Sequence, residues 1–403
     1  MSTLWEFLKA MTEVIQSLSI GKFPFYWRTK ELDKSGKPYG TMMLDFDLTY
    51  DADFGFLKQK MSVELKEAIE AVYHFDHNIG YLQEGAEEFK TYGFEYLDVI
   101  SDALSDHKAI VHPMKVVDIG CGGGLVLNEI KKRFPNARLH GVDPSPTAKR
   151  ASKHFDFNLL GDFYPPRDRS TISSADLVLH YDVLEHVANP LKMLEEIYVD
   201  LRPGGLLVFS VPDCSKAIEN GDISMCIHEH INYFSVYSLR YLVEGAGFQN
   251  VSVFRGKHGG TLFCVAEKPA MKSNKLSAER EHNPAEGFSR FVLKNQRLCK
   301  KFNKFLKQTA DATIGFYVPL RAIPYVTKLK VRNDFKFYDD SCFFKNRVLD
   351  GFENKEILGI ADLEVSPPDY TVVMTHIFGP LIKQNIAARS INTKVILIDE
   401  FYE

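Results

Sequence analysis

Glycines and two carboxylates that could hold a nucleoside-like ligand lie close together near the middle of the chain. Asp118 precedes the run Gly120-Cys121-Gly122-Gly123-Gly124, and a second acid follows in Gly141-Val142-Asp143-Pro144. Glycines let the backbone turn sharply and approach a ligand, and an acid ending the next strand can bind both hydroxyls of a ribose. This spacing predicts a cofactor site built from a strand, a glycine loop, a helix and a second strand.

Two neighbours of the glycine loop distinguish between cofactor classes. A dinucleotide site needs G-x-G-x-x-G/A, but the third small residue is replaced by Leu125. Asp118 would oppose a pyrophosphate, whereas it suits the ammonium and sulfonium groups of S-adenosylmethionine. The loop and its flanking residues, Asp118 to Gly124 with Asp143 and Pro144, are therefore expected to bind S-adenosylmethionine. An ordinary tight strand-to-helix turn is the alternative.

Strands and helices that would position this site alternate along the following sequence. Residues 159–163 read as a strand that ends in Asp162 and Phe163, an acid and a ring available for an adenine. Residues 175–182 form another strand, which places His180 near the transferred methyl group or in a structural hydrogen bond. A fifth strand is expected at 206–210, and an antiparallel hairpin at 248–254 and 261–267. The pattern predicts a doubly wound α/β sheet.

The first motif and the order of parts from Val111 to Lys268 resemble class I S-adenosylmethionine-dependent methyltransferases. This resemblance implies a seven-stranded doubly wound sheet closed by the hairpin. It also implies a lid formed by helices before the first strand, with Tyr81 and Tyr92 as candidate substrate residues. Rings that fill a helix interface are an equally good reading of both tyrosines.

Three further features resemble the bacterial nucleotide-sugar C-methyltransferase family. These are Cys226-Ile227-His228-Glu229-His230-Ile231-Asn232-Tyr233-Phe234-Ser235, the turn His258-Gly259-Gly260-Thr261, and an appended second α/β unit. The resemblance implies that Glu229 and His230 remove a proton, with His228 next to them, and that His258, Gly259 and Gly260 contact the substrate. Two departures count against it: Ile227 replaces a tyrosine, and the cysteine-built N-terminal zinc module is missing, because no cysteine precedes Cys121.

The chemistry of the segment can also be argued from its residues. Histidine titrates near neutrality, and a neighbouring carboxylate can orient its ring, so Glu229 and His230 would serve a sugar hydroxyl as well as a carbon acid. O-methylation therefore stands beside C-methylation. His228 and His230 could ligate a metal, but no third ligand lies in range along the sequence, so no metal is predicted.

Four segments are expected along the chain. Residues 1–110 read as a mainly helical region or lid, 111–270 as the methyltransferase domain, 271–310 as a linker with a long helix, and 311–403 as a smaller Rossmann-like domain. An amphipathic helix is expected near the N-terminus, packed on the protein or on a second subunit. The Rossmann-like domain has only one glycine in Gly315-Phe316-Tyr317-Val318-Pro319, so no dinucleotide site is expected there.

Composition excludes several function classes. The 403 residues carry a net charge of −4, which gives no basic footprint for nucleic acid. Six single cysteines and no long apolar run predict a reduced, cytoplasmic chain without a membrane span. We expect a methyltransferase acting on a sugar, which the family resemblance implies to be nucleotide-linked, with a homodimer as one option. A non-catalytic S-adenosylmethionine-binding subunit in glycan assembly is the alternative from another class.

Overall fold

The computed structural model describes residues 17–25, 30–31, 43–74, 87–107, 114–257, 259–270, 284–341, 344–349, 351–352 and 354–402. These residues form two compact units. The central unit comprises Met61–Cys214 and Glu229–Glu279, and the terminal unit comprises Met1–Lys60, Ser215–His228 and Arg280–Glu403. The predicted N-terminal helix, Tyr81 and His258 lie outside the described residues, as does the side chain of Tyr92. No helix in the described ranges has the length and apolar character needed to cross a membrane.

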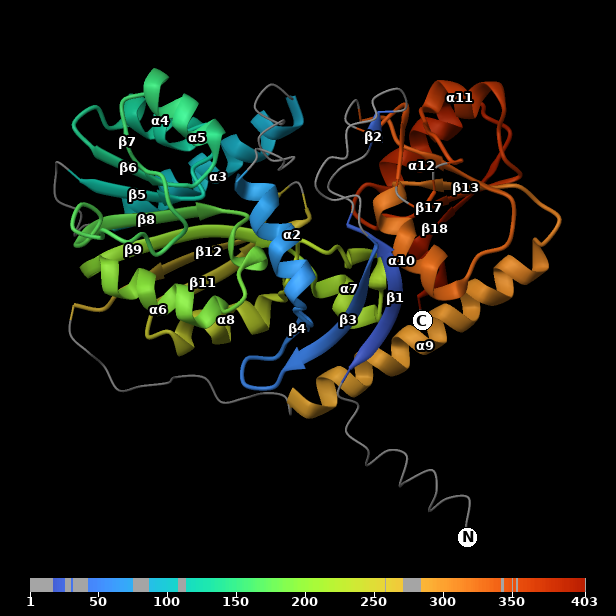
Figure 1. The fold of residues 1–403 in the computed structure, drawn as a ribbon, viewed down its shortest axis with the longest axis horizontal. Coiled ribbons are helices and arrows are strands. Elements are labelled where there is room, and N and C mark those ends of the chain that lie inside the picture. Colours follow the sequence, from blue (N-terminus) through green and yellow to red (C-terminus); the bar gives the residue numbers. More distant parts are fainter. Residues whose placement is uncertain are drawn as a thin grey trace, which may run out of the picture. The chain divides into compact units, whose positions relative to one another are not determined.

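A doubly wound α/β sheet forms the body of the central unit (Figure 1). Its strand order is β11-β12-β9-β8-β5-β6-β7, and the strands are parallel except where β12 pairs with β9 and with β11. The strands are β5 (Lys115–Ile119), β6 (Arg138–Val142), β7 (Asn158–Leu160), β8 (Ala175–Tyr181), β9 (Leu201–Pro212), β11 (Gln249–Arg255) and β12 (Thr261–Glu267). The predicted seven-stranded sheet and its closing hairpin are confirmed.

Helices cover both faces of this sheet. The helices of the central unit are α2 (Val63–His74), α3 (Glu87–Asp106), α4 (Leu125–Arg133), α5 (Pro146–His154), η2 (Leu184–His186), α6 (Pro190–Asp200) and α8 (Val236–Gly245), and β10 (Asn232–Tyr233) precedes α8. Tyr96 and Leu97 of α3 and Leu127 of α4 share one apolar cluster with Val116 and Leu177 of the sheet. On the other face, α6 packs against α8.

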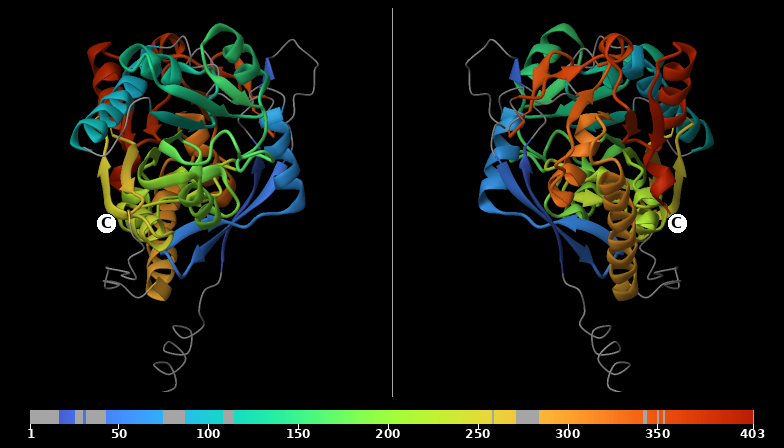
Figure 2. Two further views of the ribbon diagram at one scale, coloured as in Figure 1. Left: turned by 90° about the vertical axis from the view of Figure 1, so that its left-hand side faces the viewer. Right: turned by 90° about the vertical axis from the view of Figure 1, so that its right-hand side faces the viewer.

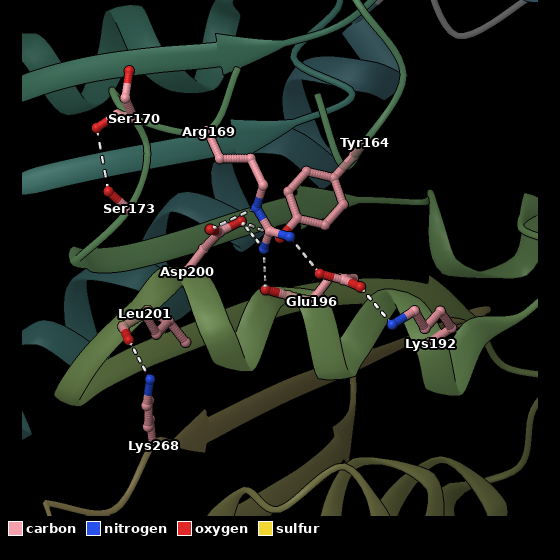
Figure 3. A network of polar contacts seen from close by, with 9 residues as sticks. All are labelled: Tyr164, Arg169, Ser170, Ser173, Lys192, Glu196, Asp200, Leu201 and Lys268. Carbon is pink, nitrogen blue, oxygen red and sulfur yellow. Dashed lines mark hydrogen bonds and ion pairs between the residues drawn. The ribbon is translucent and has the colours of Figure 1, made fainter. Parts of the chain in front are cut away.

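An ion-pair network fixes the long connection between β7 and β8 to helix α6 (Figure 3). The Arg169 guanidinium donates to both Asp200 oxygens, at 3.0 and 2.8 Å, and also pairs with Glu196. The Tyr164 hydroxyl donates to Asp200 at 2.6 Å, and Lys192 pairs with Glu196 at 2.6 Å. Because the Asp200 side chain is nearly buried, this bidentate pairing anchors the connection far more firmly than an exposed pair would.

The terminal unit contains a second parallel sheet, of order β16-β14-β13-β17-β18. Its strands are β13 (Ile314–Tyr317), β14 (Phe335–Tyr338), β16 (Ile357–Leu358), β17 (Tyr370–Val373) and β18 (Lys394–Leu397), and its helices are α10 (Pro319–Leu329), α11 (Ile360–Val365), α12 (Gly379–Ala388) and η4 (Ile398–Phe401). The long helix α9 (Pro284–Gln308) belongs to this unit, together with α7 (Ser215–Asn220) and η3 (Ile223–Met225). Figure 2 shows α9 as one straight orange helix. Its predicted apolar face is buried at Phe291, Leu298 and Phe302.

The N-terminal residues differ from the predicted mainly helical region. β1 (Leu18–Pro24), β3 (Met43–Asp51) and β4 (Phe56–Gln59) pair antiparallel, in blue in Figure 2, and the two-residue strand β2 (Lys30–Glu31) pairs with β15 (Arg347–Val348). Leu44, Phe46 and Leu48 are buried while Asp45 points outward, which is the period-two pattern of a strand. Residues 1–110 are therefore not one region: 1–60 belong to the terminal unit and 61–110 to the central unit.

Candidate active site

The glycine loop lies at the point of the central sheet where the strand order reverses. β6 and β7 follow β5 on one side, and β8 and β9 lie on its other side, so the switch point falls between β5 and β8. Ligands of open α/β sheets bind at such a point, beyond the carboxyl ends of the strands. Gly120 begins the turn after β5, and Asp182 and Val183 follow β8.

The backbone of the loop explains why glycines occupy it. Gly120, Gly122 and Gly124 have φ angles of 73°, 49° and 72°, in the left-handed region that side chains disfavour. A Cβ atom on Gly120 would lie 2.7 Å from Cγ2 of Val183, and one on Gly124 would lie 2.8 Å from Cε1 of Phe157. The loop therefore needs glycine both for its conformation and for its close contacts.

Asp143 at the end of β6 ties the glycine loop to helix α5. Its Oδ2 accepts from the backbone N–H of Gly122 at 2.9 Å, and its Oδ1 accepts from Ser145 at 2.8 Å. Ser145 in turn caps α5 by accepting from Ala148 at 3.1 Å. Asp143 thus orders the loop, and its position at the strand end is the one predicted for the ribose-binding acid. Pro144 links it to Ser145.

Asp118 is a buried carboxyl group next to the loop, with 3% of its surface exposed. Burial, and then the charge of Asp143, raise its pKa to about 8. A neighbouring cation would favour the ionised form and lower this pKa. The electrostatics therefore suit a positively charged ligand. Cys121, in the same loop, is also buried, and burial raises the pKa of its thiol well above the usual value, so the thiol is unreactive.

The predicted adenine-binding pair lies at the carboxyl end of β7. Oδ1 of Asp162 accepts from the backbone N–H of Phe163 at 2.9 Å, and the ring of Phe163 is 40% exposed. An exposed ring at this edge of the sheet is compatible with stacking on a base.

His180 does not have the environment of a proton acceptor. It lies inside β8, is fully buried, and stacks on Phe209 with the ring centroids 4.3 Å apart. Neither ring nitrogen has a hydrogen-bond partner among the described residues, and burial lowers its pKa to about 3. The predicted catalytic candidate is thus a neutral core ring.

His228 is also a structural residue, in the terminal unit, rather than part of a catalytic segment. Its Nδ1 lies 3.1 Å from the amide nitrogen of Gln59, and its Nε2 lies 3.2 Å from the carbonyl oxygen of Phe23. The amide can only donate and the carbonyl can only accept, so Nε2 carries the hydrogen. Burial lowers the pKa to about 4, and the ring packs against Phe23 and Phe46. The sequence prediction did not account for these partners.

His230 has different neighbours from those expected. Its ring meets that of His186 edge-on, with centroids 4.9 Å apart, and one ligand atom each of Glu185, His186 and His230 lies within 4.8 Å of the others. Glu229 is buried, and its backbone carbonyl accepts from Nδ1 of His186 at 2.9 Å. His230 thus forms a cluster with a Glu-His pair from after β8, whereas Glu229, its predicted partner, contacts His186 through its backbone carbonyl.

Hydrogen bonds hold the two parts of this cluster together. The backbone N–H of Ile231 donates to the carbonyl of Glu185 at 2.7 Å. The side-chain amide of Asn232 donates to the carbonyls of Leu184 and Val187 at 3.1 and 2.8 Å. These bonds fix η2 against the strand that follows His230. We call Glu185, His186 and His230 the Glu-His-His cluster.

Asp182 and Tyr96 are two residues next to β8 that the sequence prediction did not include among its candidates. Asp182 has a φ of 51°, accepts from the Ser210 hydroxyl at 2.9 Å, and has its pKa raised to about 6 by burial. The Tyr96 hydroxyl of α3 donates to the carbonyls of Val208 and His180, at 2.8 and 3.2 Å. An acid directly after a buried strand was a readable signal for Asp182, whereas nothing in the sequence links Tyr96 to β8 and β9.

The remaining predicted substrate residues lie in the β11–β12 turn. Gly259 and Gly260 both have φ angles of 75°, and the carbonyl of Gly260 accepts from the backbone N–H of Asp213 at 2.8 Å. This bond joins the turn to the end of β9. Their predicted contact with substrate stays a prediction.

Comparison with known proteins identifies the central unit. The family model described as "Methyltransferase domain" matches residues 89–253, which include β5 to β9 of the central sheet and the Glu-His-His cluster and end within β11. These residues are a methyltransferase domain. The match confirms the predicted domain type and its cofactor, S-adenosylmethionine. It ends before the terminal sheet begins.

Individual relatives are similar over a short stretch. The ubiquinone biosynthesis O-methyltransferase of Methylobacterium sp. (strain 4-46) is 38% identical over 98 residues, 23% of this chain and 39% of that protein. The trans-aconitate 2-methyltransferase of Rhodopseudomonas palustris (strain BisB18) is 32% identical over 107 residues, 25% of this chain and 40% of that protein. The chain thus spans about two fifths of the curated relatives it matches.

A solved structure is similar over a longer stretch but at lower identity. The Burkholderia thailandensis 1,6-didemethyltoxoflavin-N1-methyltransferase, with 1,6-didemethyltoxoflavin and S-adenosylhomocysteine bound, is 17% identical and has a TM-score of 0.39. The match covers 56% of this chain and 96% of that one.

Proposed function

We propose that the whole chain transfers a methyl group from S-adenosylmethionine to a small-molecule acceptor that loses its proton at the Glu-His-His cluster. One observation carries this proposal: Gly120 of the cofactor loop lies so close to Val183 that a Cβ would be 2.7 Å from its Cγ2, and Val183 is two residues before Glu185. The cofactor loop and the cluster are therefore neighbours. Methyl transfer needs an acceptor atom aligned with the methyl group and a group that activates it.

The acceptor that we propose is a sugar, in the first place a nucleotide-linked sugar. Support comes from the resemblance of residues 226–235 and of the appended parallel sheet to sugar C-methyltransferases. Ile227 is buried and supplies no hydroxyl to stabilise an enolate. This favours O-methylation as the second candidate, and one of the two relatives described above is an O-methyltransferase.

The test is release of S-adenosylhomocysteine by the full chain. We would incubate it with S-adenosylmethionine and a panel of nucleotide-linked keto- and hydroxy-sugars, with ubiquinone-type phenols and tricarboxylates as other acceptors. Mass spectrometry would measure release, and NMR of the product would distinguish a methyl ether from a new carbon branch. We expect turnover with a nucleotide-linked sugar.

A His230→Ala variant should bind S-adenosylmethionine with unchanged affinity and lose turnover. His107→Ala is the matched control, because His107 lies 3.5 Å from Glu267 in the same unit but outside the cluster. Turnover with only the phenols or tricarboxylates would refute the sugar acceptor. Cofactor binding without release from any acceptor would favour the non-catalytic subunit.

A further inference from the structure

The Glu-His-His cluster brings three metal-ligating groups together from two distant parts of the chain. One ligand atom of each residue lies within 4.8 Å of the others, and Oε1 of Glu185 is 3.6 Å from Nε2 of His186. A tetrahedral zinc ion with bonds of about 2.0–2.2 Å holds its ligand atoms about 3.3–3.6 Å apart. We propose that Glu185, His186 and His230 bind a first-row divalent transition-metal ion.

The hydrogen bond of His186 orients it as a metal ligand. Its Nδ1 lies 2.9 Å from the carbonyl oxygen of Glu229, which can only accept, so Nδ1 carries the hydrogen. In the neutral ring the lone pair is then on Nε2, the atom that faces Glu185. Histidine ligands commonly donate their second nitrogen to a backbone carbonyl in this way, which fixes the tautomer and the ring orientation.

Glu185 is a buried carboxylate whose negative charge has little compensation from neighbouring groups. Only 1% of the residue is exposed, and neither oxygen has a hydrogen-bond partner within the described ranges. A carboxylate in such a place is costly unless it is paired or coordinates a metal. A divalent ion between Glu185 and the two histidines would compensate this charge.

The cluster is both fixed and reachable. Backbone and side-chain hydrogen bonds from Ile231 and Asn232 hold η2 in place, so binding needs only small side-chain movements. His186 and His230 are partly exposed, whereas Glu185 is covered. An ion can therefore enter past the histidine rings and reach the carboxylate.

The ligand types select the class of ion. Two imidazoles with one carboxylate suit Zn²⁺, Fe²⁺, Mn²⁺ or Co²⁺, whereas Mg²⁺ and Ca²⁺ prefer oxygen ligands only. Glu185 and His186 are the further ligands for His230 that the sequence did not reveal. His228, the other member of the expected pair, is engaged by Gln59 and Phe23.

The use of the ion rests on the proposed function, but its binding does not. Bound beside the cofactor loop, it would accept an oxygen of the acceptor as a ligand and lower the pKa of that hydroxyl or of a carbon next to a carbonyl. The three side chains would then act by holding the ion, and the proton of the acceptor would pass to solvent water rather than to one of them.

Cobalt binding to the tag-free full chain tests the proposal. After chelation and dialysis, we would titrate Co²⁺ by calorimetry and record its visible spectrum, which reports the ligand type and coordination number. We expect one ion per chain, with nitrogen and oxygen ligands and no thiolate band. His230→Ala and Glu185→Gln should each weaken binding by at least about 10–100-fold, since even outer partners of a metal ligand have effects of that size.

Controls separate ligand loss from loss of fold. His107→Ala removes half of another Glu-His pair in the same unit and should leave Co²⁺ binding unchanged. Glu185→Gln keeps the side-chain volume, so its melting temperature and its affinity for S-adenosylmethionine should stay close to those of the wild type. A variant that still folds and binds the cofactor but has lost Co²⁺ supports the site.

Each possible failure has a distinct meaning. Absence of Co²⁺ binding by the wild type, a thiolate spectrum, or unchanged binding by His230→Ala and Glu185→Gln would overturn the metal site. Turnover that survives complete metal removal would leave the proposed function intact and overturn the role of the ion. Specific Co²⁺ binding without turnover on any acceptor would support the site and count against the proposed function.

Discussion

The central sheet and the sheet of the terminal unit have related strand orders, but the turns that follow β5 and β13 differ. β5 leads into a loop with three glycines at positive φ, and Asp143, which follows the next strand, accepts from the backbone N–H of Gly122 in that loop. β13 leads instead into Val318, also at a positive φ of 66°, and Pro319. A sheet topology that suits ligand binding thus becomes a cofactor site only where the turn exposes its backbone.

The acids that follow the second strand of each sheet show the same difference. In the central unit, Asp143 accepts from the backbone N–H of Gly122 in the loop and from that of Ser145. In the terminal unit, Asp340 accepts from the Tyr317 hydroxyl and from the backbone of Ile360, and Asp339 accepts from Ser341. The terminal acids are therefore engaged in local structure.

The largest expected effect comes from adding one methyl group to the glycine loop. Gly120→Ala would place a Cβ 2.7 Å from Val183 in a backbone region with φ 73°. Strain of about 1–3 kcal/mol, with the clash, should weaken S-adenosylmethionine binding roughly 100-fold. Calorimetric titration of the purified chain with S-adenosylmethionine measures this loss of affinity.

The second sheet supplies a matched control for this variant. A Cβ on Gly315 would lie 2.8 Å from the Tyr338 ring, so Gly315→Ala introduces a similar clash in β13. It should lower the melting temperature and leave cofactor affinity unchanged. Equal cofactor affinity in Gly120→Ala and the wild type would contradict the assignment of the loop.

A smaller effect is expected from Asp143→Asn, because an amide group would replace one oxygen that faces a backbone donor. A buried donor left without a partner costs about 1–3 kcal/mol, so S-adenosylmethionine affinity should fall by about tenfold. Asp340→Asn should change only stability, by about 1 kcal/mol. Similar losses of affinity in both variants would remove the contrast between the sheets.

The glycine loop and the strands could be predicted because their signals are local: a glycine spacing, an acid at a strand end, and apolar runs. The strand formed by Met43–Asp51 also has a local pattern, so its omission was a misreading. The cluster around His230 could not be predicted, because hydrogen bonds of the folded chain join it to Glu185 and His186. The different environments of His228 and His230, two residues apart, follow from the same tertiary contacts.

The pH dependence of cofactor binding should follow Asp118. Its pKa of about 8 in the free protein means that the carboxyl is mostly protonated at neutral pH, so binding of a cation should release a proton. Affinity should rise with pH and level off near pH 8. Calorimetry in two buffers with different ionisation enthalpies counts the protons, and Asp118→Asn should remove both the proton release and the pH dependence.

The same pKa has a consequence for the stability of the free protein. Folding raises the pKa of Asp118 above its value in the unfolded chain, so the folded state favours the protonated acid. As pH rises from about 4 toward 8, ionisation of Asp118 stabilises the unfolded chain, and the free energy of unfolding therefore falls. Relative to Asp118→Asn, the wild type should lose unfolding free energy across this range and then level off. A constant difference between the two unfolding curves would exclude the raised pKa.

The smallest effect is expected for Val318→Gly. Glycine relieves the strain of a left-handed backbone at φ 66°, which stabilises the folded chain, but it also raises the conformational entropy of the unfolded chain. Because the two effects oppose each other, the free energy of unfolding should change by less than about 1 kcal/mol. Denaturant unfolding measures this change. Binding of a nucleotide by this variant but not by the wild type would show that the valine alone blocks a site in the second sheet.

The central claim is that the chain has one cofactor site, formed by the glycine loop of the central unit. Titration of the full chain with S-adenosylmethionine in a calorimeter tests it most directly. The account predicts one molecule bound per chain, with binding greatly weakened in Gly120→Ala and unchanged in Gly315→Ala. Two molecules per chain, or binding that survives Gly120→Ala and is lost in Gly315→Ala, would contradict it.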